Sequence, residues 1–235
     1  MPSSSYHQRR SRVETYFDRT AVKAWERLTS DAPVSGVRAT VRAGRGEMRS
    51  TLLSWLPEDL SGERILDAGC GPGELSVEVA RRGAQVVGVD VSSNLIDIAR
   101  QRRPEDLAPS RLDYRVNDLL DAELGVFDRV ISMDVLIHYP CHDAVAALAG
   151  LAERTRQQMV FTFAPRTPLL ATMHAVGKLF PRGDRSPAIE PVAKRNLHRA
   201  IEAHPGLGQQ DWLIGRTQLV RRGFYISQAL ELKRP

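Results

Sequence analysis

The chain has 235 residues, of which 42% are hydrophobic, enough for one sizeable α/β domain with extensions but not for two independent cores. Its two cysteines, Cys70 and Cys141, offer neither a disulfide framework nor a C-x-x-C metal pair, so a reducing cytoplasm and no resident metal are expected. The polar, basic residues 1–11 lack an apolar core, and we therefore expect no signal peptide there.

The formal charge of +5 is distributed unevenly along the chain. Residues 1–62 carry a net +3, residues 63–150 a net −6 and residues 151–235 a net +8. For any single arginine, a solvated surface position is the ordinary explanation. The asymmetry as a whole favours an anionic ligand, an anionic lipid surface or a nucleic acid over a neutral partner.

The apolar periodicity predicts an N-terminal helical extension followed by alternating strands and helices. The extension comprises helices over residues 9–30 and 46–55. The alternation predicts a parallel sheet with helices on both faces and ligands beyond the carboxyl ends of its strands. The predicted strands are 64–68, 85–89, 111–116, 127–133, 158–163, 211–220 and 223–232, and the predicted later helices are 74–82, 93–102, 142–153 and 192–203.

The most informative stretch is residues 65–73, an apolar run that ends in Asp67 and is followed by three glycines at alternate positions. Glycines let backbone N–H groups and a helix N-terminus approach a ligand that a Cβ would push away. A second apolar strand ends in Asp90, an arrangement that holds a ribose diol. The alternative is a tight turn whose glycines serve packing only, but the two acids favour a nucleoside cofactor.

The spacing of these glycines separates the candidate cofactors. A dinucleotide fingerprint needs a glycine at position 74, where this chain has Glu74, and Asp67 would repel a pyrophosphate. An acid beside the loop suits a ligand that carries an amino group and a sulfonium. The pattern resembles the first motif of the class I S-adenosylmethionine-dependent methyltransferases.

This resemblance implies a Rossmann-like, doubly wound sheet of seven strands with the last one antiparallel, and S-adenosyl-L-methionine as cofactor, converted to S-adenosyl-L-homocysteine. It also implies that Asp118 accepts a hydrogen bond from the adenine amino group and that the Leu119 N–H meets the ring, although Asp118 is equally suited to cap the next turn. The expected cofactor-binding residues are Asp67, Gly69, Cys70, Gly71, Gly73, Asp90, Val91, Asn117, Asp118, Leu119, Met133 and Asp134.

Residues 133–140 follow the fourth predicted strand, and in this superfamily that strand end faces the methyl group. The Asn/Asp-Pro-Pro-aromatic tetrad of nucleic-acid amino-methyltransferases is missing, and so is a basic and aromatic platform for stacking bases, so no nucleic-acid substrate is expected. The segment resembles the corresponding motif of the magnesium-protoporphyrin IX O-methyltransferases. Further similar tracts are residues 16–18, 41–44, 54–56, 163–165, 177–181 and 224–227.

The resemblance therefore covers nearly the whole chain and implies methylation of a propionate of magnesium protoporphyrin IX in chlorophyll or bacteriochlorophyll synthesis. It also implies a helical arm or cap over residues 1–60, a methyltransferase domain over 61–235 and a substrate-covering lid over 165–191. Magnesium chelatase is an implied partner, and peripheral contact with the inner or photosynthetic membrane is implied as well. One departure is Thr29, where relatives from oxygenic organisms can carry an aromatic residue.

The catalytic candidates are His138, Tyr139 and Tyr16. His138 has three interpretations: it orients the reactive carboxylate, it approaches the magnesium as an axial ligand, or it is a structural histidine. Its position at the substrate-facing strand end favours the functional ones. For both tyrosines, core packing is the stronger alternative.

The candidate partners of the porphyrin propionates are the basic residues that flank the expected cover, namely Arg42, Arg45, Arg49, Arg166 and Lys178. Two other functions stay open from the residues alone. One is a class I O-methyltransferase for another lipophilic or anionic molecule, such as a quinone precursor. The other is a scaffold that binds the cofactor without catalysis.

Overall fold

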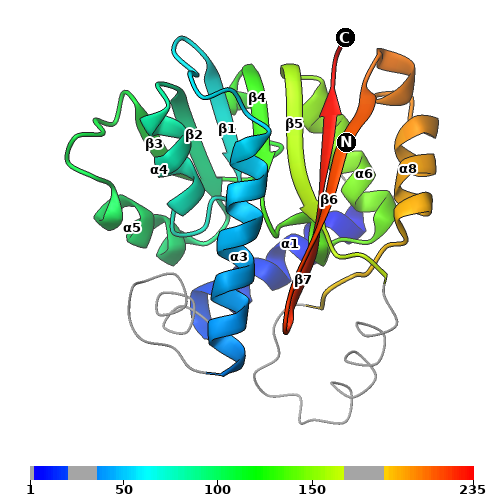
Figure 1. The fold of residues 1–235 in the computed structure, drawn as a ribbon, viewed down its shortest axis with the longest axis horizontal. Coiled ribbons are helices and arrows are strands. Elements are labelled where there is room, and N and C mark those ends of the chain that lie inside the picture. Colours follow the sequence, from blue (N-terminus) through cyan, green and yellow to red (C-terminus); the bar gives the residue numbers. More distant parts are fainter. Residues whose placement is uncertain (1–2, 21–35, 167–187) are drawn as a thin grey trace.

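The protein, described by a computed structural model over residues 3–20, 36–166 and 188–235, is built around one seven-stranded sheet (Figure 1). The strand order is β3-β2-β1-β4-β5-β7-β6, in which the pairs from β3 to β5 are parallel and β7 runs antiparallel to both neighbours. The doubly wound sheet with an antiparallel last strand is thus confirmed. The strands are β1 Arg64–Ala68, β2 Gln85–Asp90, β3 Leu112–Val116, β4 Phe127–Ser132, β5 Thr155–Phe163, β6 Leu213–Arg222 and β7 Tyr225–Lys233.

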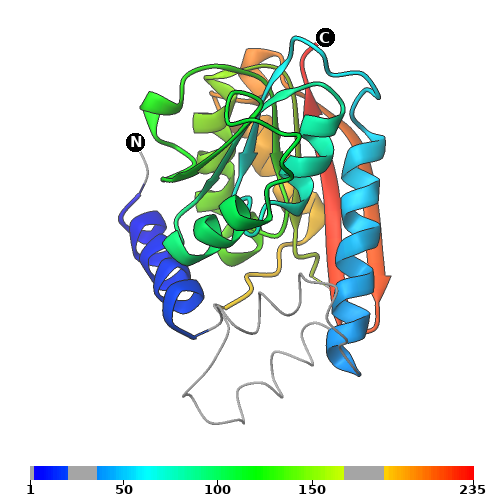
Figure 2. The ribbon, with the colours of Figure 1, turned by 90° about the vertical axis from the view of Figure 1, so that its left-hand side faces the viewer.

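Helices cover both faces of the sheet, as its buried, mostly apolar central strands require (Figures 1 and 2). Helices α3, α4 and α5 pack in one apolar cluster, and α6 and α8 pack in the other. Figure 2 shows α1 on the side of the sheet opposite to α3. The α-helices are α1 Ser4–Thr15, α3 Val37–Ser54, α4 Glu74–Arg81, α5 Ser93–Arg102, α6 Cys141–Ala152 and α8 Lys194–Ala203. The shorter helical segments are the π-helix η1 Tyr16–Thr20 and the 3-10 helices η2 Ala122–Leu124, η3 Leu136–His138 and η4 Gly208–Gln210.

The two N-terminal helices begin earlier than the sequence predicts. Helix α1 begins at Ser4, where the Ser3 hydroxyl accepts a hydrogen bond from the Tyr6 N–H and caps the helix. Helix α3 begins at Val37, nine residues before the predicted start, because packing overrides the low helix propensity of glycine. A Cβ on Gly44 would lie 2.5 Å from the Tyr225 ring, so glycine allows α3 to pack directly against β7.

Two predicted features fall partly or wholly outside the described residues. The helix predicted over residues 9–30 is described only as far as residue 20, and most of the lid predicted over 165–191 is not described. Arg166 and residues 188–191 are described, and a short parallel bridge joins Pro165 to Val192. The proposed division into an arm, a domain and a lid stays a prediction.

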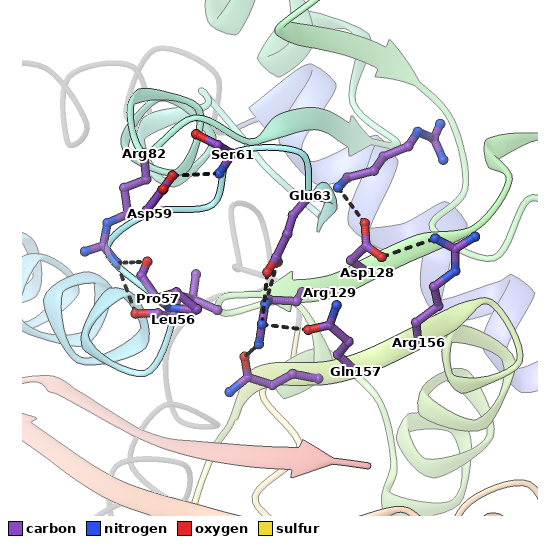
Figure 3. A network of polar contacts seen from close by, with 12 residues as sticks. Leu56, Pro57, Asp59, Ser61, Glu63, Arg82, Asp128, Arg129, Arg156 and Gln157 are labelled. Carbon is purple, nitrogen blue, oxygen red and sulfur yellow. Dashed lines mark hydrogen bonds and ion pairs between the residues drawn. The ribbon is translucent and has the colours of Figure 1, made fainter. Parts of the chain in front are cut away.

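A row of polar side chains crosses four strands of the sheet, beginning at Glu63 just before β1, at the end opposite the glycine loop. Arg129 of β4 pairs with Glu63 at 2.6 Å and donates to Gln158 of β5 at 2.6 Å. Gln158 donates to Glu231 of β7, and Arg216 of β6 pairs with the same carboxylate at 2.6 Å. Figure 3 shows the Glu63 end of this row, where Arg129 also bonds Gln157. These contacts connect the residue before β1 to β4, β5, β7 and β6.

Replacing Glu231 with glutamine is expected to lower the free energy of unfolding by about 2 kcal/mol at neutral pH, because a charge-assisted bond in a buried position is lost. Burial alone would raise the pKa of Glu231, but hydrogen bonds from Arg216 and Gln158 lower it to about 2. Its contribution is therefore present above about pH 4.5 and disappears as the pH falls toward 2. Denaturant unfolding measures this effect. Arg222→Gln, which breaks an exposed pair with Glu47, is the control and should change stability by less than about 0.5 kcal/mol.

Candidate active site

A pocket opens at the carboxyl ends of β1, β2 and β4, where the sheet topology predicts a ligand. The glycine loop, residues 69–73, connects β1 to α4, and its residues 69–72 form one wall of the pocket. Gly69, Gly71 and Gly73 have φ angles of +82°, +53° and +83°, which side chains rarely adopt. A Cβ on Gly69 would lie 2.1 Å from Val135, so the loop and the end of β4 approach each other closely only with glycine at that position.

Most of the predicted site residues line this pocket. Of the cofactor candidates, Gly73 and Asp118 are outside its lining; Gly73 instead accepts a hydrogen bond from the Tyr114 hydroxyl at its carbonyl. The predicted residues that do line it are Asp67, Gly69, Cys70, Gly71, Asp90, Val91, Asn117, Leu119, Met133, Asp134, His138, Tyr139, Arg45 and Arg49.

Two carboxyl groups lie behind the loop, the buried Asp67 and the half-buried Asp90. Asp67 accepts a hydrogen bond of 2.5 Å from the Ser76 hydroxyl, and Asp90 accepts the N–H groups of Gly71 at 3.0 Å and Ser92 at 2.9 Å. Burial raises the pKa of Asp67 to about 7 and that of Asp90 to about 6. A ligand that offers a positive charge or hydroxyl donors would therefore stabilise the ionised form of both acids.

Asp118 is held by three groups at the end of β3. Its Oδ1 accepts the Leu120 N–H at 2.8 Å and the Tyr6 hydroxyl at 2.9 Å, and its Oδ2 lies 3.2 Å from Nε of Arg10. The turn-capping role weighed for Asp118 is therefore present. The hydrogen bond between Asp118 and the adenine stays a prediction. The sequence neighbours of Asp118, Asn117 and Leu119, line the pocket.

The sequence analysis missed Tyr6, which forms an aromatic wall of the pocket together with the predicted Tyr139. Tyr6 lines the pocket and stacks on Tyr139, with ring centroids 5.0 Å apart and planes at 22°. Burial raises the pKa of both phenols, so they are neutral hydrogen-bonding groups at physiological pH. Tyr6 precedes the predicted start of the first helix, and no motif marked it. Phe17 lines the pocket too, next to Tyr16, which does not.

His138 lies in η3 after β4 and lines the pocket, with 6% of its surface exposed. Its Nδ1 is 3.4 Å from the carbonyl oxygen of Ala188, and its ring meets that of Phe17 edge-on at a centroid distance of 6.4 Å. The ring therefore lies between the strand end and the N-terminal segment. Such a place suits contact with a ligand, and it also suits structural packing.

Asp134 is the centre of a polar cluster that the sequence did not reveal. It has a φ of +60°, and its N–H donates to the Thr162 hydroxyl at 2.7 Å. Its carboxylate accepts Nη1 of Arg45 at 2.6 Å, the Tyr225 hydroxyl at 3.0 and 3.2 Å, and the Ser227 hydroxyl at 3.2 Å. Tyr225 and Ser227 belong to a tract marked only by family resemblance, and Thr162 carried no signal.

Of the remaining basic and aromatic candidates that the structure describes, Arg49 alone lines the pocket. Tyr16 packs edge-on against Phe17 with centroids 5.1 Å apart, and neither Arg42 nor the exposed Arg166 lines the pocket. Arg49 lines it while paired with Glu74 and Glu78. Lys178 lies outside the described residues. Their roles toward a substrate stay predictions.

Comparison with known proteins places this site in context. Residues 132–234 match the family described as magnesium-protoporphyrin IX methyltransferase C-terminus, and residues 65–158 match a methyltransferase domain. The chain is 50% identical to the magnesium-protoporphyrin O-methyltransferase of Rhodobacter capsulatus, covering 99% of this chain and 100% of that protein. The corresponding protein of Synechocystis sp. is 34% identical over 94% of this chain and 95% of its own length.

A solved structure is similar over the same extent. The crystal structure of magnesium protoporphyrin IX methyltransferase from Synechocystis, with bound S-adenosylhomocysteine, superimposes with a TM-score of 0.82 at 31% identity. The match covers 96% of this chain and 99% of that one.

Proposed function

The chain belongs to the magnesium-protoporphyrin O-methyltransferase family, and we propose that its pocket transfers a methyl group from S-adenosylmethionine to a propionate carboxylate of magnesium protoporphyrin IX. The product is the monomethyl ester. The observation that carries this conclusion is the 50% identity over the full length of the chain, which extends beyond the fold that all class I methyltransferases share. A quinone precursor as acceptor, or a non-catalytic scaffold, is the alternative.

The residues around the pocket fit S-adenosylmethionine. We assign Asp90 to the ribose hydroxyls and Asn117 and Leu119 to the adenine, since all three line the pocket. Asp67 adds negative charge behind the loop when it is ionised. Gly69 lets the loop pack closely against Val135 at the end of β4, which sets the position of the loop beside the pocket. When bound, the cofactor supplies an electrophilic methyl group on a sulfonium.

The acceptor side needs positioning more than proton transfer. A propionate has a pKa close to that of glutamate, about 4.3, and is an anion at neutral pH, so no general base is required. The chain's contribution is to orient the carboxylate oxygen in line and to keep water away from it. A cation paired with the attacking oxygen would stabilise the ground state, so we infer that basic residues hold the other oxygen or the other propionate. We assign orientation of the reactive carboxylate to His138.

Affinity for S-adenosylmethionine is expected to rise about tenfold between about pH 5.5 and 7.5. The pKa values of about 7 for Asp67 and 6 for Asp90 exceed their ordinary value of 3.8 because of burial. In the unliganded protein both groups hold protons up to these values, so their contribution to folding stability falls as the pH rises from about 4 to 7. Their ionised forms, by contrast, attract the cationic ligand.

Titration calorimetry across this pH range measures the effect. The Asp67→Asn variant should show a shallower profile, while Asp97→Asn, on the exposed face of α5, should keep the slope of the native protein. A profile that is flat in the native protein would show that the two acids do not take part in cofactor binding.

Two finer proposals concern partners. We propose that the porphyrin arrives from the porphyrin-carrying subunit of magnesium chelatase. We also propose that the protein touches a membrane surface. The net positive charge of residues 1–62 and 151–235 and the exposed Phe224 beside Arg222 support the membrane contact. Across the described residues, every helix is too short or too polar to cross a bilayer. Flotation with anionic vesicles tests the membrane contact, which neutral vesicles should not reproduce.

A choice among acceptors tests the proposed reaction. With S-adenosylmethionine saturating, we expect turnover of magnesium protoporphyrin IX and only background methylation of a catechol quinone precursor. The dimethyl ester of the same porphyrin, which has no carboxylate left, should inhibit without being methylated. Turnover of the catechol in preference to the porphyrin would overturn the assignment, and binding of all ligands without turnover would favour the scaffold.

A further inference from the structure

Helix α1 is held against the rest of the protein by polar contacts more than by apolar packing. All twelve residues of this helix are described, and Tyr6 is the only one that is buried. Ahead of it, the Ser3 and Ser5 hydroxyls donate to the Asp143 carboxylate of α6 at 2.5 and 2.7 Å. The position of α1 therefore depends on a few polar contacts, and with it depends the part of the pocket wall that Tyr6 forms.

Asp118, at the end of β3, is the contact that holds Tyr6 itself. Its Oδ1 accepts the Tyr6 hydroxyl at 2.9 Å and the Leu120 N–H at 2.8 Å, and its Oδ2 lies 3.2 Å from Nε of Arg10. A carboxylate has about four acceptor positions, so three of them are taken. An adenine amino group would have to compete with Tyr6 and Arg10 for this carboxylate, which lies outside the pocket lining while Tyr6 lies within it.

The pairing of Arg10 with Asp118 also accounts for part of the uneven charge along the chain. Residues 1–62 carry a net +3 and residues 63–150 a net −6. Arginines of the first segment pair with acids of the second, as in Arg10–Asp118, Arg45–Asp134 and Arg49–Glu74. Opposite charges of the two segments thus attach the N-terminal helices to the domain within the molecule, and the anionic partner expected from the sequence is not needed to explain them.

We propose that Asp118 anchors α1 instead of accepting the adenine amino group, and that Tyr6 is the positioning residue through which this carboxylate acts on the nucleoside. The Tyr6 hydroxyl reaches the residue between Asn117 and Leu119, which both line the pocket, and the Tyr6 ring stacks on Tyr139. Releasing α1 from Asp118 therefore removes one wall of the pocket at its adenine end. The proposal rests on the cofactor assigned above, and it replaces the adenine contact that the family resemblance implies for Asp118.

Two ligands separate an anchor from an adenine contact. S-adenosylhomocysteine carries the adenine amino group, and its analogue with purine in place of adenine lacks that group alone. A carboxylate that accepts the amino group favours the first ligand by about 10- to 100-fold, and this preference disappears when the carboxylate is changed. In Asp118→Asn, which keeps an oxygen for the Leu120 N–H, we expect both ligands to bind about five- to tenfold more weakly, with their affinity ratio within about threefold of the native ratio.

Variants of α1 test the anchor while the Asp118 carboxylate stays intact. Tyr6→Phe removes the hydroxyl and keeps the ring, and Arg10→Gln removes the guanidinium. Each should weaken both ligands about three- to tenfold and speed hydrogen exchange of the α1 amides but not of the sheet amides. Arg10→Lys should recover part of the loss. Arg12→Gln, at an exposed position of the same helix and with the same change in charge, is the control and should change neither affinity.

The outcomes separate the proposal from its alternatives. A loss in Asp118→Asn that is confined to S-adenosylhomocysteine would return Asp118 to the adenine. Native affinity for both ligands in Tyr6→Phe and Arg10→Gln, or native exchange of the α1 amides in Asp118→Asn, would also overturn the proposal. Failure of the native protein to bind S-adenosylhomocysteine would instead reject the cofactor assignment itself.

Discussion

His138→Ala is expected to lower kcat for porphyrin methylation by about 100-fold while changing the affinity for S-adenosylhomocysteine by less than about threefold. His138 lines the pocket after the end of β4, next to Phe17. A side chain in this place acts on the acceptor, whose carboxylate needs orientation for an in-line attack. The measurement combines steady-state kinetics with titration calorimetry.

The control for this substitution is His142→Ala. His142 is four residues further along, in α6, with 70% of its side chain exposed, and its loss should leave kcat unchanged. If the affinity for S-adenosylhomocysteine falls together with kcat in His138→Ala, the histidine is structural. An absorption shift of the bound magnesium porphyrin that is lost in this variant would identify His138 as an axial ligand instead of a carboxylate partner.

Asp90→Ala is expected to weaken binding of S-adenosylhomocysteine by more than about 100-fold, because a carboxylate on a ribose diol makes two hydrogen bonds to a charged group. Asp90 also accepts the N–H groups of Gly71 and Ser92, so it ties the glycine loop to the start of α5. Its removal therefore affects both the ligand and the shape of its site.

Asp97→Asn on α5 provides the control, since Asp97 is exposed and pairs only weakly with Arg100 on its own helix. Thermal unfolding without ligand shows whether the Asp90 variant still folds. A folded Asp90→Ala protein that binds S-adenosylhomocysteine within about threefold of the native protein would contradict the assignment of this carboxylate to the ribose.

The elements that the sequence predicts well are those whose signal is local. Alternating strands and helices define the sheet. The glycines between β1 and α4 and the acids at strand ends define the edge of the sheet at which a ligand binds. The positive φ angles of Gly69, Gly71 and Gly73 agree with the predicted glycine loop, because the conformation of such a turn depends on residues that are close in the sequence. The start of α3 was missed because Gly44 weakens the helix locally and is needed only for packing on Tyr225.

The rest of the site depends on contacts between distant segments, which spacing along the chain does not reveal. Tyr6 meets Asp118 across 112 residues, and Tyr225 meets Asp134 across 91. Asp134 could be predicted as a pocket residue from its position after β4, but its partners could not. The same holds for Arg49, whose position in α3 gave no indication of Glu74 and Glu78.

Mass spectrometry of the porphyrin tests the central claim most directly. The purified protein is incubated with magnesium protoporphyrin IX and with S-adenosylmethionine that carries an isotopically labelled methyl group. We predict that the porphyrin gains one labelled methyl group and that mild alkaline hydrolysis removes it, as expected of an ester. A porphyrin that stays unlabelled, in a protein that binds S-adenosylhomocysteine, would contradict the proposed function.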